Sequence, residues 1–279
     1  MIGLGDMGAP MARRLVAAGY EVAGYDVDRA RIKAARATPC DSAAATLSGS
    51  SAAIVMVRTL DQVREVLFGP AGIAKAGRDG LDVAVMSTID PTSMAALAKE
   101  ANFGIVDAPV SGGVQGAEAG SLTVMVAGSS EVVDRLRPLF QVFGANVFVV
   151  GDRPGMAQAV KLANQLMLAA AVLGTLEGLS VARASGLEPE QVLPVIEPST
   201  GSSWAVENFD VVRGFWDAAE PLKGALGIIL KDLASIDREA RARELDLPAA
   251  QLALERLENA WRRAGLDAPA RPELRSGGA

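Results

Sequence analysis

Three glycines near the start of the chain constrain its fold more than any other feature. Gly3, Gly5 and Gly8 form a G-x-G-x-x-G pattern that leads directly into a segment of helical composition at residues 9–18. In such a pattern the first glycine permits a tight turn, the second lets the backbone approach a pyrophosphate, and the third lets a helix pack closely on a strand. Free N–H groups at the helix N-terminus favour a bound phosphate. The pattern therefore predicts an α/β sheet that begins with a dinucleotide site.

An acidic residue follows this pattern at the distance that a nucleotide site requires. Residues 20–25 are typical of a short strand that ends at Asp26, 18 residues beyond Gly8. A carboxylate there can hold both ribose hydroxyls, which favours NAD over NADP. Arg29 and Arg31 are close in sequence and could soften that preference. The alternative is a glycine turn that holds no ligand.

The strand that should precede Gly3 is short. A strand usually has about five residues, whereas only Met1 and Ile2 stand before Gly3. This shortness is consistent with a start codon assigned too late or with a truncated chain. We expect an incomplete first strand to weaken the sheet at its centre.

Strand-like and helix-like segments alternate through the first half of the chain. The expected strands are short, continuously apolar runs, as in strands that are covered on both faces. They are residues 52–57, 82–86, 105–107, 123–127 and 146–150, with a helix expected at residues 61–68. Such alternation predicts an α/β domain with a parallel-rich sheet.

Only helices are expected after Gly151. A long helix is predicted at residues 157–185, ending at Gly186 as its C-terminal cap. Further helices are predicted at residues 189–196, 226–244 and 248–264. The breakers at residues 151–155 separate the two patterns. We expect a nucleotide-binding domain at residues 1–153, an all-helical domain at 154–268 and a disordered tail at 269–279.

The absence of histidine restricts the chemistry that this chain can perform. It excludes histidine-assisted nucleophiles, histidine-based dehydrogenases and histidine-ligated zinc. Acid–base chemistry must then use Lys, Asp, Glu, Tyr or the single cysteine, Cys40. One cysteine also excludes internal disulfides and cysteine-cluster metal sites, so we expect no metal. It is consistent with a reducing cytoplasm.

Charge and hydropathy argue against nucleic acid and membranes as partners. The chain has 27 Lys+Arg against 33 Asp+Glu, a net charge of −6, and no basic run. Its longest uncharged apolar run, residues 162–176, is shorter than the roughly 20 residues that span a bilayer. We expect that run to be a buried helix. The N-terminus has no targeting signal, which makes the cytoplasm the default location.

Two groups of residues are candidates for chemistry. Lys161 lies near the start of the long apolar helix, and Asn164 and Gln165 follow it on the same face. No histidine competes with this lysine for the acid–base role, although such a lysine is often only a solvated side chain. The second group is the segment DAPVSGG at residues 107–113, which follows a predicted strand. It therefore lies at the carboxyl edge of the sheet, where open α/β folds bind ligands.

Within that segment, Ser111 and the amides of Gly112 and Gly113 can form a cradle for a carboxylate. The alternative is an ordinary glycine turn.

Five motifs occur together and in order along the chain. They are Gly3-Leu4-Gly5-Asp6-Met7-Gly8, Ser87-Thr88, the segment DAPVSGGVQGAEAGSL, Gly155 with Lys161-x-x-Asn164, and Lys231-Asp232-Leu233. With them, residues 1 to about 266 resemble the β-hydroxyacid dehydrogenase family, which includes 3-hydroxyisobutyrate dehydrogenase and tartronate semialdehyde reductase. The resemblance implies an α/β Rossmann domain followed by an all-α domain, usually assembled as a homodimer or homotetramer through the helical part.

The resemblance also implies roles for individual residues. Lys161 matches the catalytic lysine and is expected to act as general acid and base; burial is expected to favour its neutral form. Asn164, Gln165 and the loop Ser111-Gly112-Gly113 are expected to bind the substrate. The expected cofactor-binding residues, for NAD or NADP, are Gly3, Leu4, Gly5, Asp6, Met7, Gly8, Asp26, Thr88 and Lys231.

The expected function is hydride transfer between NAD(P) and a small β-hydroxy acid. Gln165 stands where a second asparagine is commoner, and the tail lacks the usual aspartate-rich ending after the last helix, so the substrate is left open. Ala157 stands where a second glycine is common before the lysine. The 6-phosphogluconate dehydrogenases are much longer, and imine reductases generally lack the lysine. The alternative from another class is a non-catalytic dinucleotide-binding or assembly module derived from this family.

Overall fold

The computed structural model describes residues 1–76, 80–216 and 225–263 of the chain. The chain divides into two compact units, Met1–Lys161 and Leu162–Ala279. A long helix, α7 (Met156–Arg183), begins in the first unit and continues in the second. The tail predicted at 269–279 lies outside the described residues.

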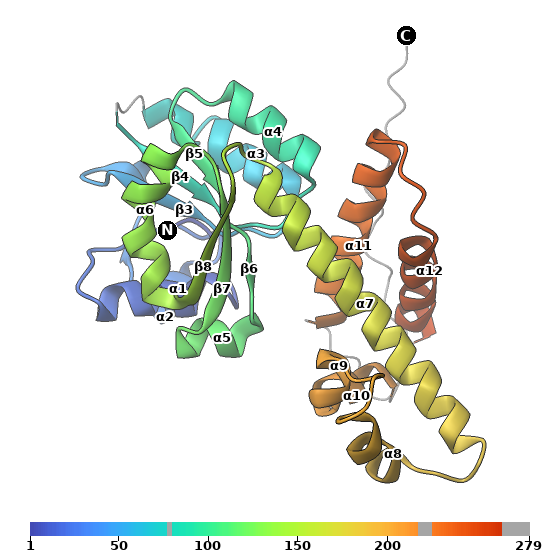
Figure 1. The fold of residues 1–279 in the computed structure, drawn as a ribbon. Helices are drawn as coiled ribbons and strands as arrows, with labels where there is room; N and C mark the ends of the chain where they lie inside the picture. The colour runs from blue at the N-terminus through green and yellow to red at the C-terminus, as the bar shows by residue number, and fades with distance from the viewer. Residues whose placement is uncertain (77–79, 217–224, 264–279) are drawn as a thin grey trace. The chain divides into compact units, whose positions relative to one another are not determined.

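The first unit contains a twisted sheet whose strands are mostly parallel (Figure 1). Its larger part has the strand order β3-β4-β5-β7-β6, with β8 also paired to β7. The pairs β3/β4, β4/β5 and β7/β8 are parallel, whereas β5/β7 and β6/β7 are antiparallel. The bounds are β3 (Ala52–Val55), β4 (Asp82–Val85), β5 (Gly104–Asp107), β6 (Val110–Ser111), β7 (Leu122–Ala127) and β8 (Gly144–Gly151). The predicted parallel-rich sheet is therefore confirmed.

The short N-terminal segment occupies the centre of the sheet. Ile2 forms single parallel bridges to Tyr25 on one side and to Val55 on the other. It thereby connects the larger sheet to a two-stranded parallel ladder of β1 (Ala23–Gly24) and β2 (Thr38–Pro39). The Ile2 amide donates to the carbonyl of Ile54 at 2.8 Å, and the Met56 amide donates to Ile2 at 2.8 Å. On the other side the Gly3 amide donates to the carbonyl of Tyr25 at 2.9 Å, so these few residues form hydrogen bonds with both neighbours.

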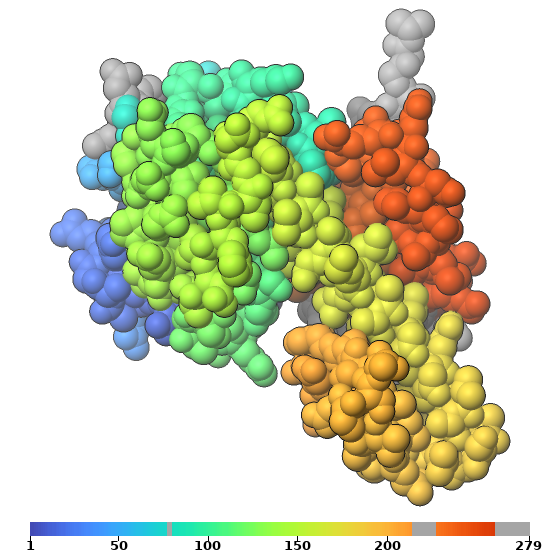
Figure 2. Space-filling view, in the orientation of Figure 1, coloured from blue at the N-terminus to red at the C-terminus, as the bar shows by residue number. Residues whose placement is uncertain are grey.

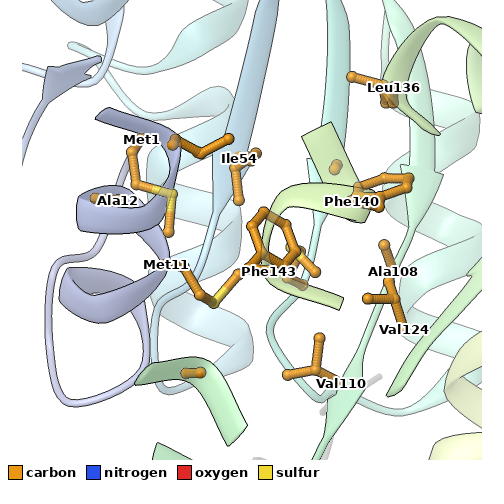
Figure 3. Close-up of a cluster of buried hydrophobic side chains, with 14 of the residues drawn as sticks. Met1, Met11, Ala12, Ile54, Ala108, Val110, Val124, Leu136, Phe140 and Phe143 are labelled. Carbon is orange, nitrogen blue, oxygen red and sulfur yellow. The ribbon is translucent and has the colours of Figure 1, made fainter. Parts of the chain in front are cut away.

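Helices cover both faces of the sheet, which explains the continuously apolar strands. On one face, Phe140 and Phe143 of α6 pack with Met11 of α1 and with strand residues such as Val110 and Val124 (Figure 3). The opposite face is closed by α3 and α4 and by two short 3₁₀ turns, Ala44–Leu47 and Ile73–Ala76. The helix bounds are α1 (Gly8–Ala17), α2 (Arg29–Ala34), α3 (Leu60–Phe68), α4 (Pro91–Glu100), α5 (Gly113–Ala119) and α6 (Ser130–Phe143).

The described part of the second unit is helical throughout, as predicted. After α7 come α8 (Pro189–Ile196), α9 (Trp204–Glu207), α10 (Phe209–Trp216), α11 (Ala225–Ala242) and α12 (Pro248–Arg263). Leu162 and Ala169 of α7 pack with apolar residues of α11 and α12, among them Leu233 and Leu257. Farther along α7, Val172 and Leu179 pack with residues of α9 and α10.

The apolar helix α7 is much less buried than expected. Of its most apolar stretch, 28% is buried inside the chain, and the side chains of Met167 and Val181 are 71% and 73% exposed. Figure 2 shows this helix, in yellow, uncovered on the face in view. The expectation of a buried helix is wrong for this outer face, because the neighbouring helices cover α7 along one side. Among the described helices α7 alone is long and apolar enough to cross a membrane, but core helices of soluble proteins meet the same criteria.

Candidate active site

The glycine-rich loop has the geometry of a dinucleotide site. Gly3 has φ +85°, and a side chain there would collide with the carbonyl oxygen of Met56, the residue that follows β3. A side chain on Gly8 would collide with the carbonyl oxygen of Gly3. A Cβ on Gly5, by contrast, would have Nη1 of Arg31 as its nearest neighbour, at 3.4 Å. The first and third glycines are thus required by packing, whereas the second leaves space beside the backbone.

The residues around this loop fit a bound dinucleotide. Met7, the N-cap of α1, makes no side-chain hydrogen bond to the helix, and the first turn of α1 has no acidic residue. Asp26 is 9% exposed; its Oδ2 accepts from the amide of Leu4 at 2.7 Å and its Oδ1 from that of Asp28 at 2.9 Å. The structure thus brings the loop and Asp26 together. Each carboxylate oxygen retains a lone pair that can accept from a ribose hydroxyl.

Mutation can separate the role of Gly5, which leaves space for a phosphate, from that of Gly8, which permits close packing. We expect Gly5→Ala to unfold at the wild-type temperature but to bind NADH at least about tenfold more weakly, because the new methyl group takes the space of a phosphate. Gly8→Ala should lower the free energy of unfolding by about 2 kcal/mol, since its Cβ overlaps a carbonyl group. Thermal unfolding and fluorescence titration with NADH measure both effects. Unchanged NADH affinity in Gly5→Ala would contradict the assignment of the loop.

Several loops leave the sheet at one edge. Val55, Val85, Asp107, Ala127 and Gly151 form one row across neighbouring strands. Because β3, β4 and β5 are parallel, the residues that follow Val55, Val85 and Asp107 lie along the carboxyl edge of these three strands, where α/β folds bind ligands.

Two of the predicted site loops begin at this edge. Thr88 is half-buried in the loop after β4, and the neighbouring Ser87 accepts a hydrogen bond from the amide of Val57 at 2.9 Å through its Oγ. Ser111 lies in β6, paired with Thr123 of β7. Gly112 and Gly113 follow with φ +124° and +63°, exposed at the start of α5. This segment is therefore a short strand followed by a helix, with the two glycines at their junction.

Asp107 and Gln158 form a buried polar network at the start of α7. Both are fully buried, and Oδ2 of Asp107 accepts from the amide of Gln158 at 2.8 Å. Burial raises the pKa of Asp107 to about 6, and backbone N–H groups of Gln158, Gly155 and Ala157 partly oppose that rise. The side chain of Gln158 reaches the loop after β4: its Nε2 donates to the carbonyl of Ser87 at 2.9 Å, and its Oε1 accepts from the amide of Ile89 at 3.2 Å.

Lys161 lies one turn after Gln158 on α7. This lysine is 7% exposed. Residues three apart share a helix face, so Lys161 lies on the same side of α7 as Gln158. Ala157, where a glycine was commoner, is fully buried against Met125 and Ala127 of β7.

Within the second unit, four polar residues are connected in series. Asn164 Nδ2 donates to Gln165 Oε1 at 3.1 Å, and Gln165 Nε2 donates to Asp232 Oδ2 at 2.6 Å. The other oxygen of Asp232 pairs with Nζ of Lys231 at 2.7 Å. Gln165 is 5% exposed and Asp232 is 1% exposed, while Asn164 is half-buried. The amide of Gln165 is thus held between Asn164 and Asp232.

The sequence prediction missed the polar partners of the site. Asp107 and Asp232 were noticed only as parts of motifs, and Gln158 was not noticed at all. Adjacency to Lys231 was a signal for Asp232, and the position one turn before Lys161 was a signal for Gln158. Among the described residues, no group of three or more Cys, Asp or Glu side chains could hold a metal ion.

Known protein families match both halves of the chain. Residues 1–151 match the NAD binding domain of 6-phosphogluconate dehydrogenase, and residues 155–270 match the NAD-binding domain of NADP-dependent 3-hydroxyisobutyrate dehydrogenase. The chain is 34% identical over 264 residues to the NAD-dependent L-serine dehydrogenase of Pseudomonas aeruginosa, covering 91% of this chain and 88% of the relative. It is 34% identical over 254 residues to the 2-hydroxy-3-oxopropionate reductase of Escherichia coli, covering 88% and 85%.

A solved structure agrees with these matches. The 3-hydroxyisobutyrate dehydrogenase of Mycobacterium tuberculosis, determined with L-serine, superposes with a TM-score of 0.82 at 29% identity, covering 97% of this chain and 96% of that one. The parallel-rich sheet of the first unit and the helical second unit agree with this likeness. The chain therefore belongs to the β-hydroxyacid dehydrogenase family and is an NAD(P)-dependent oxidoreductase.

Proposed function

We propose that this enzyme reversibly oxidises a small β-hydroxy acid, with Lys161 as the general acid and base. The burial of Lys161, one turn from a helix start anchored by Asp107 and Gln158, is the observation that carries this proposal. In oxidation, Nζ of Lys161 accepts the proton of the substrate hydroxyl, and in reduction it returns that proton. The nicotinamide supplies the hydride acceptor or donor. The products of oxidation are a semialdehyde or keto acid, the reduced cofactor and one proton.

The substrate carboxylate is assigned to the loop Ser111-Gly112-Gly113. The exposure of both glycines and the open space around Gly113 support this role. A hydroxyl and backbone amides together can hold a carboxylate without a neighbouring cation. They contribute positioning rather than proton transfer.

Asn164 and Gln165 are assigned to the substrate as well. Because an ionised Asp232 can only accept, the Gln165 amide must turn its NH₂ group toward Asp232 and its carbonyl toward Asn164. Asn164 then donates to Gln165 and keeps its own carbonyl oxygen available. We assign that oxygen to a hydroxyl or ammonium group of the substrate, with Gln165 holding Asn164 in place. Lys231, paired with Asp232, is assigned to the cofactor.

We assign NAD as the preferred cofactor. Asp26 supports this choice, since an ionised carboxylate beside the ribose repels the 2′-phosphate of NADP. Arg31 is the opposing influence, because its guanidinium lies beside Gly5. The remaining cofactor contacts are assigned to Leu4, Asp6, Met7 and Thr88.

We expect Asp26→Asn to lower the ratio of kcat/KM for NAD over NADP by about tenfold, or about 1.4 kcal/mol. The amide retains an acceptor for the Leu4 amide but loses the charge that repels a phosphate. Arg31→Ala is the complementary variant and should raise the same ratio. Initial rates with both cofactors give the numbers. A ratio unchanged in Asp26→Asn would remove Asp26 from cofactor selection.

The assembly is assigned as a homodimer or homotetramer through the helical unit, in the cytoplasm. The exposed apolar face of α7 supports a second copy as its cover, and the acidic charge balance and single cysteine fit the location. Neither nucleic acid nor a membrane is assigned as a partner.

A spectrophotometric screen at 340 nm tests the function. The panel holds L-serine, 3-hydroxyisobutyrate, L-threonate and glycerate with NAD and NADP, and tartronate semialdehyde with the reduced cofactors. Selective turnover of one acid supports the proposal and identifies the substrate. Retained NADH binding without turnover of any compound, including bulkier hydroxy acids, would favour a non-catalytic module.

A further inference from the structure

The side chain of Gln158 makes an unusual pair of contacts for a helical glutamine. It is fully buried, and both of its polar atoms form hydrogen bonds with the main chain of the loop after β4. Nε2 donates to the carbonyl of Ser87 and Oε1 accepts from the amide of Ile89, the residues on either side of Thr88. We call these two hydrogen bonds the Gln158 bridge. The bridge holds the short loop that carries Thr88 by both of its flanks.

The helix turn that contains Gln158 is itself fixed by other contacts. The amide of Gln158 donates to Asp107 at the end of β5. Gly155 has φ +102°, and a Cβ there would lie 2.8 Å from the carbonyl oxygen of Pro91, at the start of α4. Thus the first turn of α7 is anchored at β5, at α4 and at the loop after β4. Lys161 follows on the next turn of the same helix.

From these contacts we propose that Gln158 is a positioning residue for the reaction, because its bridge holds the Thr88 loop and the helix turn of Lys161 in one fixed register. This inference rests on the proposed function, which assigns Thr88 to the cofactor and Lys161 to proton transfer. Hydride and proton transfer require the cofactor, the substrate and the base to keep their geometry within a fraction of an ångström. Gln158 touches none of the reacting atoms and acts through the two elements that it joins.

An apolar residue of the same size should uncouple these elements. Gln158→Met preserves volume but leaves the Ser87 carbonyl and the Ile89 amide buried without their partner. We expect kcat to fall about 10- to 100-fold while the dissociation constant of NADH stays within about threefold. The primary deuterium isotope effect on kcat should rise, because misaligned hydride transfer becomes slower than product release. A purely structural role would lower the unfolding temperature without changing kcat well below it.

Gln158→Glu gives an independent test if the methionine variant does not fold. A protonated carboxyl group can donate to Ser87 and accept from Ile89, as the amide does, whereas a carboxylate cannot donate. The kcat of this variant should therefore fall with rising pH over an ionisation that wild type lacks. The charged groups around this position are Asp107 at β5, Asp90 beside Ile89, and Lys161. All three are also present in wild type, so they affect the pH profile of kcat in both proteins and cannot produce the additional ionisation.

Gln62→Met is the matched control. In wild type, Oε1 of Gln62 also accepts from main-chain amides, those of Arg58 and Thr59, but at the start of α3. The Gln62→Met variant should keep the wild-type kcat.

Three results would each overturn the inference. They are a kcat of Gln158→Met within threefold of wild type, a loss in that variant confined to NADH affinity, and a pH profile of Gln158→Glu parallel to that of wild type. Lys161→Ala assayed in parallel separates the two proposals: if that variant stays active, the proposed function fails, whereas an inactive Lys161→Ala beside a normal Gln158→Met refutes the bridge alone.

Discussion

Replacing Lys161 with alanine is expected to lower kcat by about 10²- to 10⁴-fold, the usual contribution of a positioned acid–base group. No histidine in the chain can take over the proton transfer. The dissociation constant of NADH should change little, because the glycine-rich loop and Asp26 that are assigned to the cofactor belong to other elements. Steady-state rates at 340 nm and fluorescence titration measure the two quantities. More than about a tenth of wild-type activity in this variant would show that Lys161 is not the acid–base group.

Lys161→Arg distinguishes proton transfer from simple charge stabilisation. Arginine keeps the positive charge, but its guanidinium does not release a proton at any working pH. We expect this variant to be about as inactive as Lys161→Ala. Activity restored by arginine would instead assign Lys161 an electrostatic role toward the substrate. Lys99→Ala, an exposed lysine in the last turn of α4, is the control for removing a lysine from the surface.

Local patterns were sufficient to predict most strands and six of the twelve described α-helices, namely α1, α3, α7, α8, α11 and α12. The run predicted as a strand at 82–86 is β4, Asp82–Val85, and the helix predicted at 189–196 is α8. Such elements are predictable because a continuous apolar run suits a strand covered on both faces, and because Pro189 marks a helix start. Helix α6 was not predicted: Pro138 lies inside it, and an internal proline normally argues against a helix.

The polar contacts of the site were less predictable than its motifs. The glycine-rich loop and the Lys161 helix appear as short sequence patterns, since each is built from neighbouring residues. The pairing of Ser111 with Thr123, the contact of Gln158 with Ser87 and that of Gln165 with Asp232 join residues 12, 71 and 67 positions apart. A single sequence holds no signal for such partners. It also does not reveal that the Gln165 amide donates a hydrogen bond to Asp232.

The second large effect concerns pH and stability, through the buried carboxyl group of Asp107. Burial raises its pKa to about 6 in the folded protein, against 3.8 for the ordinary group. A carboxyl whose pKa is raised by folding contributes stability that is fully present below pH 3.8 and is lost as the pH rises through about 6. A shift of about two units corresponds to about 3 kcal/mol in the free energy of unfolding. At pH 7 the native state therefore carries a buried carboxylate at a cost of that order.

Asp107→Asn is expected to remove this pH dependence. The asparagine oxygen can still accept from the Gln158 amide, but the side chain never ionises. Relative to wild type, the variant should gain about 2.5 kcal/mol in unfolding free energy between pH 4 and pH 7. Denaturant unfolding of both proteins across this range gives the difference, in which the titration of all other groups cancels. Asp134→Asn, an exposed carboxylate on α6, controls for the change in net charge. A wild-type-minus-variant difference that stays constant with pH would show that Asp107 titrates normally, and that its carboxylate is accommodated at the start of α7 without cost.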